Sequence, residues 1–316
     1  MELPDNTRYV AEQLGPDFGF YLHASQRLAE VNSAWQKIEI FENPLFGRVM
    51  RIDGCFMTSE RDEFFYHEPM VHLPAISHGG PRRALIVGGG DGGAAEELLK
   101  YPELEQLVLA ELDDEVVRLA REWLPAIHRG AFDDPRLELR LGDALPFIER
   151  GTERFDQIIL DLTDPFGPAT DLYTVEFYRA CKKLLNPGGV ISLHIGSPIH
   201  LKIPMARIAA SLRAVFAIVR PYLQYVPLYG TLWCMAMASD TIDPTLLSAA
   251  EVDTRLHRQE LHDLQLYNGA MHHALLTQPN FVYNLLQQPV APVHRGDILE
   301  GIHDPESLPA VRVIPA

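Results

Sequence analysis

The sequence is poor in cysteine, and the three cysteines that it holds are far apart. Cys55, Cys181 and Cys234 form no Cys-x-x-Cys pair, so neither a zinc site of the usual spacing nor a disulfide framework is indicated. We expect reduced thiols in or near a core, as in proteins of a reducing compartment.

Positively charged side chains are also scarce. The 316 residues include 27 Lys and Arg against 43 Asp and Glu, a formal net charge of −16. A nucleic-acid-binding protein needs a basic face to neutralise phosphates, so the composition argues against this class. It suits a small cationic partner, although an acidic balance alone does not identify one.

Long apolar runs are missing as well. No stretch approaches the roughly 20 apolar residues of a membrane helix, and the opening MELPDNTRYVAEQLG lacks the basic-then-apolar order of a signal peptide. We therefore expect a cytoplasmic globular protein without membrane contact.

Two patterns of hydrophobicity divide the chain. Residues 35–60 alternate apolar and polar residues around turn signals, which indicates a small antiparallel sheet, and residues 61–75 favour a short helix. From residue 83 strands alternate with helices. Strands are expected in 83–89, 104–113, 136–143, 155–164, 189–195, 219–228 and 231–239, and helices in 94–100, 116–124, 174–185 and 203–216.

This order predicts the fold class: α/β, a doubly wound, Rossmann-like, methyltransferase-type and mostly parallel sheet with a small N-terminal antiparallel β domain. We expect an N-terminal unit over residues 1–78 and a catalytic domain over 79–286. Residues 287–316 are rich in proline and polar residues, and we expect a tail there that is poorly structured or packs over the surface. Glu96 and Glu97 are expected on a solvated helix face.

A glycine loop with an acid in its midst, GGGDGG at residues 88–93, follows the first of these strands. More acids stand where the next strands end, so all should face one crevice at the carboxyl edge of the sheet. They are Asp91, Glu111, Asp113, Asp143, Asp161 and Asp164. Glu111 follows the loop by about 20 residues, where an acid binds the ribose hydroxyls of an adenosine, and Asp143 is placed to accept from the adenine amino group. Nucleoside binding is therefore predicted.

Asp91 discriminates among nucleoside ligands. It would repel the pyrophosphate of NAD, and GGGDGG is not the dinucleotide spacing GxGxxG. S-adenosylmethionine brings an amine and a carboxylate to this loop, whereas its decarboxylated form brings only the amine. The loop favours the decarboxylated form, because Asp91 can then pair with an ammonium without opposing an anion.

The strings GGGDGG, AELDDEV, DDPRLELRLGDALPFI and DLTDPFGPATDLYTVEFY resemble those of the polyamine aminopropyltransferases, the spermidine synthase family. The resemblance continues upstream in WQKIEIFENPLFGRVMRIDG and ERDEFFYHE and downstream in YNGAMHHALLTQPNF, and so covers residues 30–285. It implies transfer of an aminopropyl group from decarboxylated S-adenosylmethionine, a co-substrate, to an acceptor amine, with release of 5′-methylthioadenosine. It implies no cofactor and no metal, and an assembly of two or four copies.

The resemblance also implies roles for individual residues. Asp161 is expected to be the catalytic base or orienting acid. The donor is expected to contact Gln36, Gly88, Gly90, Asp91, Glu111, Asp143 and Ala144, and the acceptor Tyr66, His67, Asp91, Asp161, Asp164 and Tyr229. Taken without the resemblance, Asp161 reads equally well as a turn residue before Pro165, and Asp113 and Asp114 as helix-capping acids.

The acceptor side departs from the family pattern. Relatives often carry glutamine near Met57 and read Gln-x-Glu-Ser-Pro where this chain has His194 and Gly196. Putrescine remains the first candidate acceptor, with cadaverine, agmatine, 1,3-diaminopropane and spermidine as alternatives. A methyltransferase that uses S-adenosylmethionine and a silent nucleoside-binding relative are the competing functions.

Overall fold

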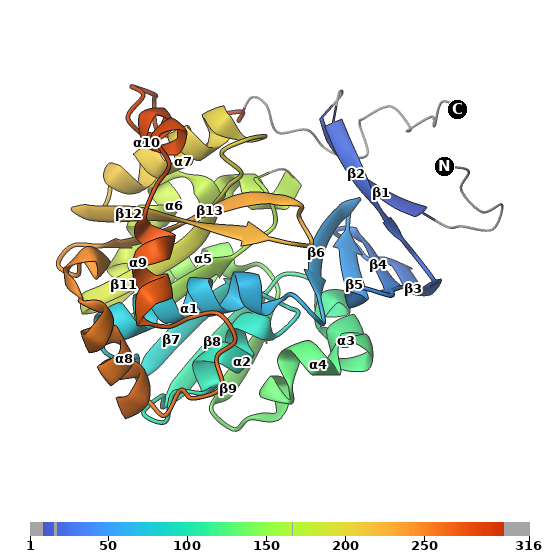
Figure 1. The fold of residues 1–316 in the computed structure, drawn as a ribbon, viewed down its shortest axis with the longest axis horizontal. Coiled ribbons are helices and arrows are strands. Elements are labelled where there is room, and N and C mark those ends of the chain that lie inside the picture. The colour runs from blue at the N-terminus through green and yellow to red at the C-terminus, as the bar shows by residue number, and fades with distance from the viewer. Residues whose placement is uncertain (1–8, 16–17, 166, 300–316) are drawn as a thin grey trace.

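The computed structural model of the protein describes residues 9–15, 18–165 and 167–299. Its largest element is a seven-stranded sheet with helices on both faces (Figure 1). The strand order is β12-β13-β11-β10-β7-β8-β9. The bounds are β7 (Arg83–Gly88), β8 (Gln106–Glu111), β9 (Leu137–Leu141), β10 (Phe155–Asp161), β11 (Leu185–Gly196), β12 (Ile218–Val226) and β13 (Thr231–Ser239).

Five adjacent strands of this sheet, β9, β8, β7, β10 and β11, run parallel, and β13 runs antiparallel to β11 and β12. The chain winds outward from β7 to β9 and then returns to place β10 on the other side of β7. Ligands of doubly wound sheets bind where the order reverses in this way. The predicted fold class is confirmed.

Alternate residues of the central strands feed two separate cores. Ala84 and Ile86 of β7 belong to the core beneath α1, whereas Leu85 and Val87 belong to the core on the opposite face. A strand buried on both faces must be apolar at every position, which explains the uninterrupted ALIV that precedes the glycine loop.

The helices are α1 (Phe64–His78), α2 (Gly93–Leu99), α3 (Asp114–Trp123), α4 (Pro125–His128), α5 (Ala144–Arg150), α6 (Val175–Lys183), α7 (Lys202–Arg213), α8 (Ala249–Arg258), α9 (Gly269–Leu276) and α10 (Asn280–Leu286). Short 3₁₀ helices span Ala131–Asp133, Gly167–Tyr173 and Pro244–Leu246. Helix α1 packs against α2, β11 and β12, so it joins the N-terminal strands to the central sheet. The division of the chain at residue 78 stays a prediction.

The N-terminal region holds more strands than the sequence pattern predicts. A four-stranded antiparallel sheet has the order β3-β4-β5-β6, and β1 pairs with β2 as a separate hairpin. The bounds are β1 (Tyr9–Gly15), β2 (Phe18–His23), β3 (Gln26–Asn32), β4 (Lys37–Asn43), β5 (Gly47–Ile52) and β6 (Cys55–Ser59). The predicted stretch 35–60 corresponds to β4–β6, whereas β1–β3 were not predicted.

The expectation that Glu97 lies on a solvated face is wrong. Its side chain is buried and accepts a hydrogen bond from Lys100 at 2.6 Å, and it lies 2.8 Å from Nε2 of His72 on α1. The carboxylate therefore joins α1 to α2. The amphipathic pattern of α2 does not predict the burial of Glu97, because its partner His72 comes from another helix.

Residues 287–299 of the expected tail pack over the surface. They contain no helix or strand, but Val293 is buried and its carbonyl accepts from the backbone of Val175. Arg207 of α7 donates to the carbonyls of Ala291 and Pro292. The rest of the expected tail, residues 300–316, lies outside the described residues.

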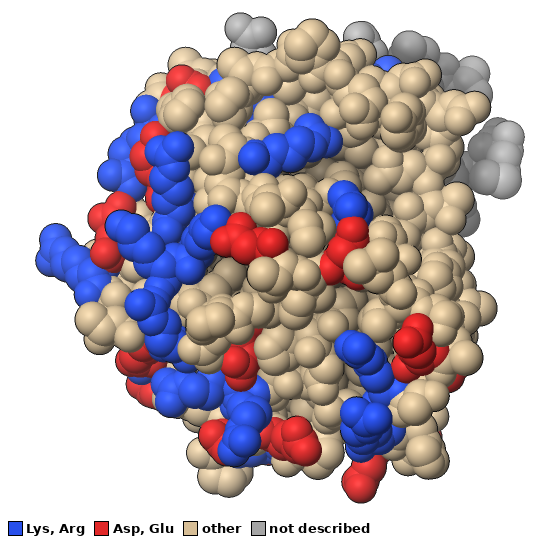
Figure 2. Space-filling view, turned by 90° about the vertical axis from the view of Figure 1, so that its left-hand side faces the viewer, with Lys and Arg blue, Asp and Glu red and all other residues tan. Residues whose placement is uncertain are grey.

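Charged side chains of both signs are mixed on the face that Figure 2 shows, where Lys and Arg lie beside Asp and Glu instead of gathering alone. Elsewhere, on α3, Arg118 pairs with Glu115 and Glu122. Among the described residues, no helix is long and apolar enough to span a membrane.

Candidate active site

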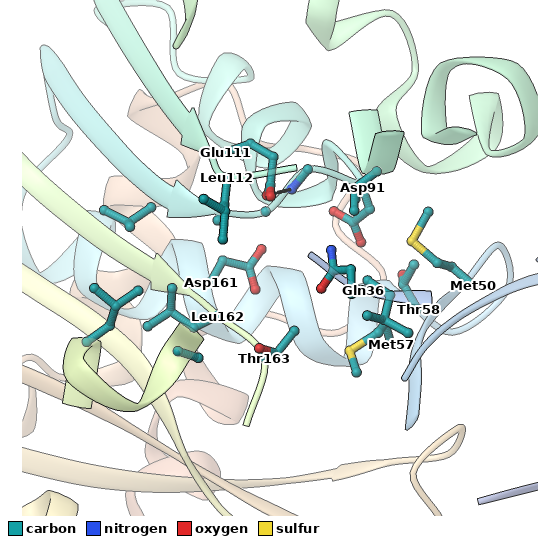
Figure 3. A pocket seen from close by; sticks show the side chains of 18 of the residues that line it. Gln36, Met50, Met57, Thr58, Asp91, Glu111, Leu112, Asp161, Leu162 and Thr163 are labelled. Carbon is teal, nitrogen blue, oxygen red and sulfur yellow. Dashed lines mark hydrogen bonds between the residues drawn. The ribbon is translucent and has the colours of Figure 1, made fainter. Parts of the chain in front are cut away.

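A cavity of about 360 Å³, which we call the large chamber, opens at the carboxyl ends of β7, β8 and β10. Figure 3 shows the side chains of Gln36, Asp91 and Asp161 reaching toward it from different elements. Every predicted site residue except Asp164 lines this chamber: Gln36, Tyr66, His67, Gly88, Gly90, Asp91, Glu111, Asp143, Ala144, Asp161 and Tyr229. The structure thus brings them together, and their roles stay predictions.

Two glycines of the loop are required by close packing. Gly88 has φ +80°, and a Cβ there would lie 2.1 Å from the carbonyl oxygen of Asp161. A Cβ at Gly90 would lie 2.8 Å from Oε2 of Glu111. Glycine at these positions lets the loop come close to the ends of β10 and β8, and it therefore brings three acids around one space.

Glu111 is buried at the end of β8 and is held by two backbone amides. Gly90 N donates to its Oε2 at 3.1 Å and Asp113 N to its Oε1 at 2.9 Å; Figure 3 shows the Glu111 side chain at the chamber. Burial raises the pKa of Glu111 to about 7, against the lowering effect of these amides. The carboxylate is thus fixed in place at the wall of the chamber.

Asp143 and Ala144 stand at the rim of the chamber. Asp143 is exposed and caps α5 by accepting from Leu145 N at 2.9 Å, and Ala144 is the first residue of that helix. One oxygen of Asp143 is used by the helix, which fixes the carboxylate beside the opening.

Gln36 lies between β3 and β4 and reaches the chamber from the N-terminal sheet. Its Nε2 donates to Oδ2 of Asp113 at 3.0 Å, and Ser33 donates to the same oxygen at 2.6 Å. Asp113 also caps α3 by accepting from Glu115 N, as predicted. The capping residue therefore has a second effect, because it positions Gln36 against the central domain.

Asp91 and His67 form one charged group at the floor of the chamber. Oδ1 of Asp91 accepts from Gly93 N at 3.0 Å, and Oδ2 lies 3.6 Å from His67 Nε2. The other ring nitrogen of His67 lies 2.9 Å from Oε2 of Glu63. Burial alone would lower the pKa of His67, but the carboxylates of Asp91 and Glu63 outweigh it and raise the pKa to about 10. At neutral pH an imidazolium therefore lies between two carboxylates.

Donor atoms of His67, Asp91 and Asp161 all lie within 4.8 Å of one another, a grouping that metal sites also show. A protonated imidazole has no lone pair to offer a metal ion. With its raised pKa, His67 acts here as a cation that partly balances the acids.

Asp161 ends β10 between the loop and the aromatic side of the chamber, with its carbonyl accepting from Gly89 N at 2.9 Å. Burial raises the pKa of Asp161 to about 6; the charge of His67 and a hydrogen bond from Tyr66 oppose the rise, and Asp91 adds to it. A carboxylate whose pKa lies near neutrality is suited to take up or hold a proton. The position of Asp161 is thus compatible with the predicted role in proton transfer, which stays a prediction.

A smaller cavity of about 60 Å³, the small chamber, lies beyond Tyr66 and Tyr229, which line both cavities. The rings of Tyr66 and Tyr229 pack edge to face at 6.2 Å, and the Tyr229 hydroxyl donates to the carbonyl of Met57 at 2.7 Å. Asp164 lines this chamber and not the large one. The single crevice expected from the strand ends is thus divided in two.

Asp164 and Glu12 are the acids of the small chamber. Burial raises the pKa of Asp164 to about 7, and Oδ1 of Asp164 has no hydrogen-bond partner. Burial raises the pKa of Glu12 to about 8, although Glu12 Oε2 accepts from Phe56 N at 2.9 Å. Glu12 could not be predicted as a site residue, because its only signal in the sequence is one acid in an otherwise β-forming stretch, YVAEQLG.

Two of the three departures from the family pattern line the small chamber, Met57 and His194. Gly196 does not line it. Gly196 has φ +98°, and a Cβ there would meet Leu201 Cδ1 at 3.1 Å. The glycine is therefore accounted for by backbone conformation, and Leu201 presents an apolar wall to the chamber.

Comparison with known proteins agrees with this geometry. Residues 63–247 match the family model described as the spermine/spermidine synthase domain, and residues 9–60 match that of the spermidine synthase tetramerisation domain. A polyamine aminopropyltransferase of Nitrosomonas europaea is 62% identical over 97% of this chain and 94% of its own length. One of Thermoanaerobacter sp. is 36% identical over 80% of this chain and 93% of its own length.

Solved structures of the same fold carry related names. A spermidine synthase in complex with the transition-state analogue AdoDATO has a TM-score of 0.84 and 35% identity, covering 90% of this chain and 96% of its own. The spermidine synthase of Thermotoga maritima has a TM-score of 0.81 and 34% identity, covering 90% and 95%. With this fold and this acid-lined site, the chain belongs to the spermine/spermidine synthase family and is a polyamine aminopropyltransferase.

Proposed function

We propose that the enzyme transfers the 3-aminopropyl group of decarboxylated S-adenosylmethionine to putrescine and forms spermidine and 5′-methylthioadenosine. The observation that carries this proposal is the pair of adjacent acid-lined chambers that share Tyr66 and Tyr229, with Asp91 and Asp161 in the large one and Asp164 in the small one. A cationic donor in the large chamber and a cationic acceptor in the small chamber would each lie beside carboxylates.

The large chamber suits a donor that is cationic at its reactive end. Glu111, Asp143 and Ala144 line this chamber, and in this proposal Glu111 binds the ribose diol while Asp143 and Ala144 contact the base. Among the described residues that line this chamber there is no Lys or Arg, and His67 is already placed between Glu63 and Asp91. A donor that carries a carboxylate would meet the acids without a free cation to pair with, which disfavours methyl transfer from S-adenosylmethionine.

The reaction needs alignment and charge stabilisation more than strong acid or base catalysis. The acceptor nitrogen attacks the methylene carbon next to sulfur, a C–N bond forms, and the C–S bond breaks with its electron pair going to sulfur. The sulfonium becomes the neutral thioether of 5′-methylthioadenosine, and the positive charge moves to the acceptor nitrogen. Before attack that nitrogen must lose a proton, which the Asp161 carboxylate accepts.

Carboxylates near the reacting atoms would stabilise the moving charge. Asp91 pairs with the ammonium of the aminopropyl group, and Asp161 faces the nitrogen that becomes positive. Tyr66 donates to Asp161 and, together with Tyr229, forms an aromatic passage for the methylene chain of the acceptor.

The small chamber limits the acceptor. Its volume of about 60 Å³ and its apolar wall of Leu14, Phe56, Leu201 and Trp233 suit a short aliphatic chain. Its acids, Asp164 and Glu12, suit a second ammonium at the far end of that chain. A four-carbon diamine meets both conditions, whereas spermidine would have to extend past the walls. Residues 9–60, which match the tetramerisation domain, would join the copies of a homo-oligomer.

The test is a mass-spectrometric assay of 5′-methylthioadenosine release. The purified enzyme receives decarboxylated S-adenosylmethionine with putrescine, cadaverine, 1,3-diaminopropane, agmatine or spermidine. We expect putrescine to have the highest kcat/KM, by more than about tenfold. A lead by another diamine would refute putrescine as acceptor. Methyl transfer from S-adenosylmethionine, or no turnover with any amine, would refute the proposal as a whole.

A further inference from the structure

His194, at the end of β11, has no role in the proposed function, yet it lines the small chamber. We infer that His194 is a specificity-determining residue, whose Nδ1 and the carboxylate of Asp164 together receive the distal ammonium of the acceptor. The inference rests on the proposed function and names a contact within the same site.

The hydrogen bonds of His194 fix its tautomer. Its Nε2 lies 2.8 Å from the carbonyl oxygen of Leu162 and 2.7 Å from the hydroxyl of Tyr173. The Tyr173 hydroxyl donates its single proton to the carbonyl of Thr163 at 2.8 Å. A carbonyl can only accept, so Nε2 carries the hydrogen. In the neutral ring Nδ1 is therefore a bare acceptor.

Nothing in the described structure satisfies that acceptor. His194 Nδ1 is buried without a hydrogen-bond partner, and so is Asp164 Oδ1, which lies 4.0 Å away. At 4.0 Å the two atoms are too far apart to share a hydrogen bond even when Asp164 carries a proton, so both lack a partner. A primary ammonium has three N–H groups and would satisfy both atoms from about 2.9 Å, once the side chains that enclose them in the free structure move apart to admit it.

Protonation of His194 would offer another way to satisfy the pair, but the surroundings oppose it. Burial lowers the pKa of His194 to about 4, against the raising effect of the Leu162 carbonyl. The side chain is 4% exposed, and its ring stacks on Trp233 at 5.6 Å, with Tyr173 edge-on at 5.8 Å. The imidazole is thus neutral and rigidly oriented, with its lone pair held toward Asp164.

The same contacts explain why the pair selects the far end of the acceptor and not its reacting end. Tyr173 and His194 bind the carbonyls of Leu162 and Thr163, the two residues between Asp161 and the end of the acidic segment at Asp164. Asp161 faces the large chamber and Asp164 the small one. An acceptor that spans the two acids places its distal nitrogen beside His194.

The experiment compares putrescine with n-butylamine, which has the same carbon chain but no distal ammonium. For the wild type and His194→Phe, kcat/KM is measured for each amine at saturating decarboxylated S-adenosylmethionine. Loss of one hydrogen bond to a charged group corresponds to between about tenfold and about a hundredfold. We expect His194→Phe to lose this factor with putrescine and to change by less than about threefold with n-butylamine. An equal loss with both amines would mean that His194 is structural and would overturn the inference.

Two further variants distinguish a direct contact between His194 and the acceptor amine from a structural role of His194. Tyr173→Phe removes the bond to Thr163 but leaves Nδ1 in place, and we expect it to affect both amines alike. His194→Gln restores an acceptor oxygen, and we expect it to recover most of the preference for putrescine; this variant also serves if His194→Phe does not fold. A preference that stays lost in a folded His194→Gln would contradict the proposed contact.

Binding provides a readout that is independent of turnover. In ¹⁵N-histidine NMR spectra, with 5′-methylthioadenosine bound, we expect putrescine but not n-butylamine to shift the Nδ1 resonance of His194. If no amine reacts but this shift is seen, the proposed function fails and the distal-ammonium site stands. If putrescine reacts without the shift, the proposed function stands and the site is refuted.

Discussion

The acids predicted for the large chamber stand at neighbouring strand ends, whereas the small chamber takes its residues from β1, β6, β11, β13 and the segment after β10. In the large chamber, the fold requires a glycine at Gly88 and places Glu111 directly after a buried strand. In the small chamber, the fold makes no such demand on Glu12 or His194. The part of the site that the fold fixes can therefore be predicted from motifs, and the small chamber, which no motif marks, is where we propose that the acceptor is selected.

The largest expected effect lies at Asp161 in the large chamber. Asp161→Asn keeps the shape of the side chain but removes the base and one charge. We expect kcat with putrescine to fall by between about a hundredfold and about ten-thousandfold, measured by 5′-methylthioadenosine release. The matched control is Asp240→Asn, since Asp240 is exposed and pairs with Lys182; it should retain activity. Loss of less than about tenfold in Asp161→Asn would contradict a role in proton transfer.

A change in the large chamber should act on the donor alone. In Asp91→Asn the ammonium of the donor loses its carboxylate, and we expect the Kd of decarboxylated S-adenosylmethionine to rise by about tenfold to a hundredfold. The opposite chamber supplies the matched variant, Glu12→Gln, which should leave this Kd unchanged and raise the KM of the acceptor. If calorimetry showed both variants weakening both ligands equally, the division into two chambers would be wrong.

The acids of the small chamber predict a dependence of acceptor binding on pH. The pKa values of Asp164 and Glu12 are raised by burial to about 7 and about 8, so both carboxyls are partly protonated in the free enzyme at neutral pH. A dication favours their ionised forms. Acceptor binding should therefore release protons at pH 7, and the KM for putrescine should fall as the pH rises from 6 to 8. Titration calorimetry in two buffers of different ionisation enthalpy measures the release.

The same shift predicts a change in stability. Because the pKa of Glu12 is raised in the folded state above its ordinary value of 4.5, folding is favoured by its proton and loses that support as the pH rises from about 4.5 to about 8. Glu12→Gln should consequently raise the Tm of the free enzyme at pH 8 more than at pH 5. An equal change at both pH values would show that Glu12 does not titrate as described.

The smallest effect is expected at Asp113, which does not line the large chamber but holds Gln36, a residue that does. Asp113→Ala removes the cap of α3 and the anchor of Gln36. Loss of a cap costs about 0.5–2 kcal/mol of stability, and we expect a donor Kd raised by only a few-fold. Asp114→Ala is the control, because Asp114 is exposed in the first turn of the same helix without these bonds. Equal effects of the two changes would show that Gln36 does not depend on Asp113.

The sequence predicts the central sheet well, because buried parallel strands are apolar throughout and are followed by glycine or acid at their ends. It predicts the N-terminal sheet only in part. Residues 9–32 are mostly half-buried or exposed in β1–β3, so a clear period of two is missing. Glu97 and Glu12 were not recognised as buried for a related reason. Each is buried by an element distant in sequence, α1 for Glu97 and β6 with the residues after β10 for Glu12.

The sequence pattern also did not predict that the crevice is divided into two chambers. Strand ends predict that acids meet at one edge, but Tyr66 from α1 and Tyr229 from the turn before β13 stand between the two cavities. Side chains from separate elements create that boundary, and the spacing along the chain carries no information about it. The resemblance to a family predicted Tyr66, Asp164 and Tyr229 as site residues, whereas their arrangement around two cavities is known only from the structure.

The central claim is that the acids around the glycine loop select a donor whose reactive end is purely cationic. The most direct test is to measure the Kd of decarboxylated S-adenosylmethionine and of S-adenosylmethionine by titration calorimetry, for the wild type and for Asp91→Asn. We predict that the wild type binds the decarboxylated form at least about tenfold more tightly, and that Asp91→Asn reduces this preference. Equal affinity of the wild type for both nucleosides would contradict the account.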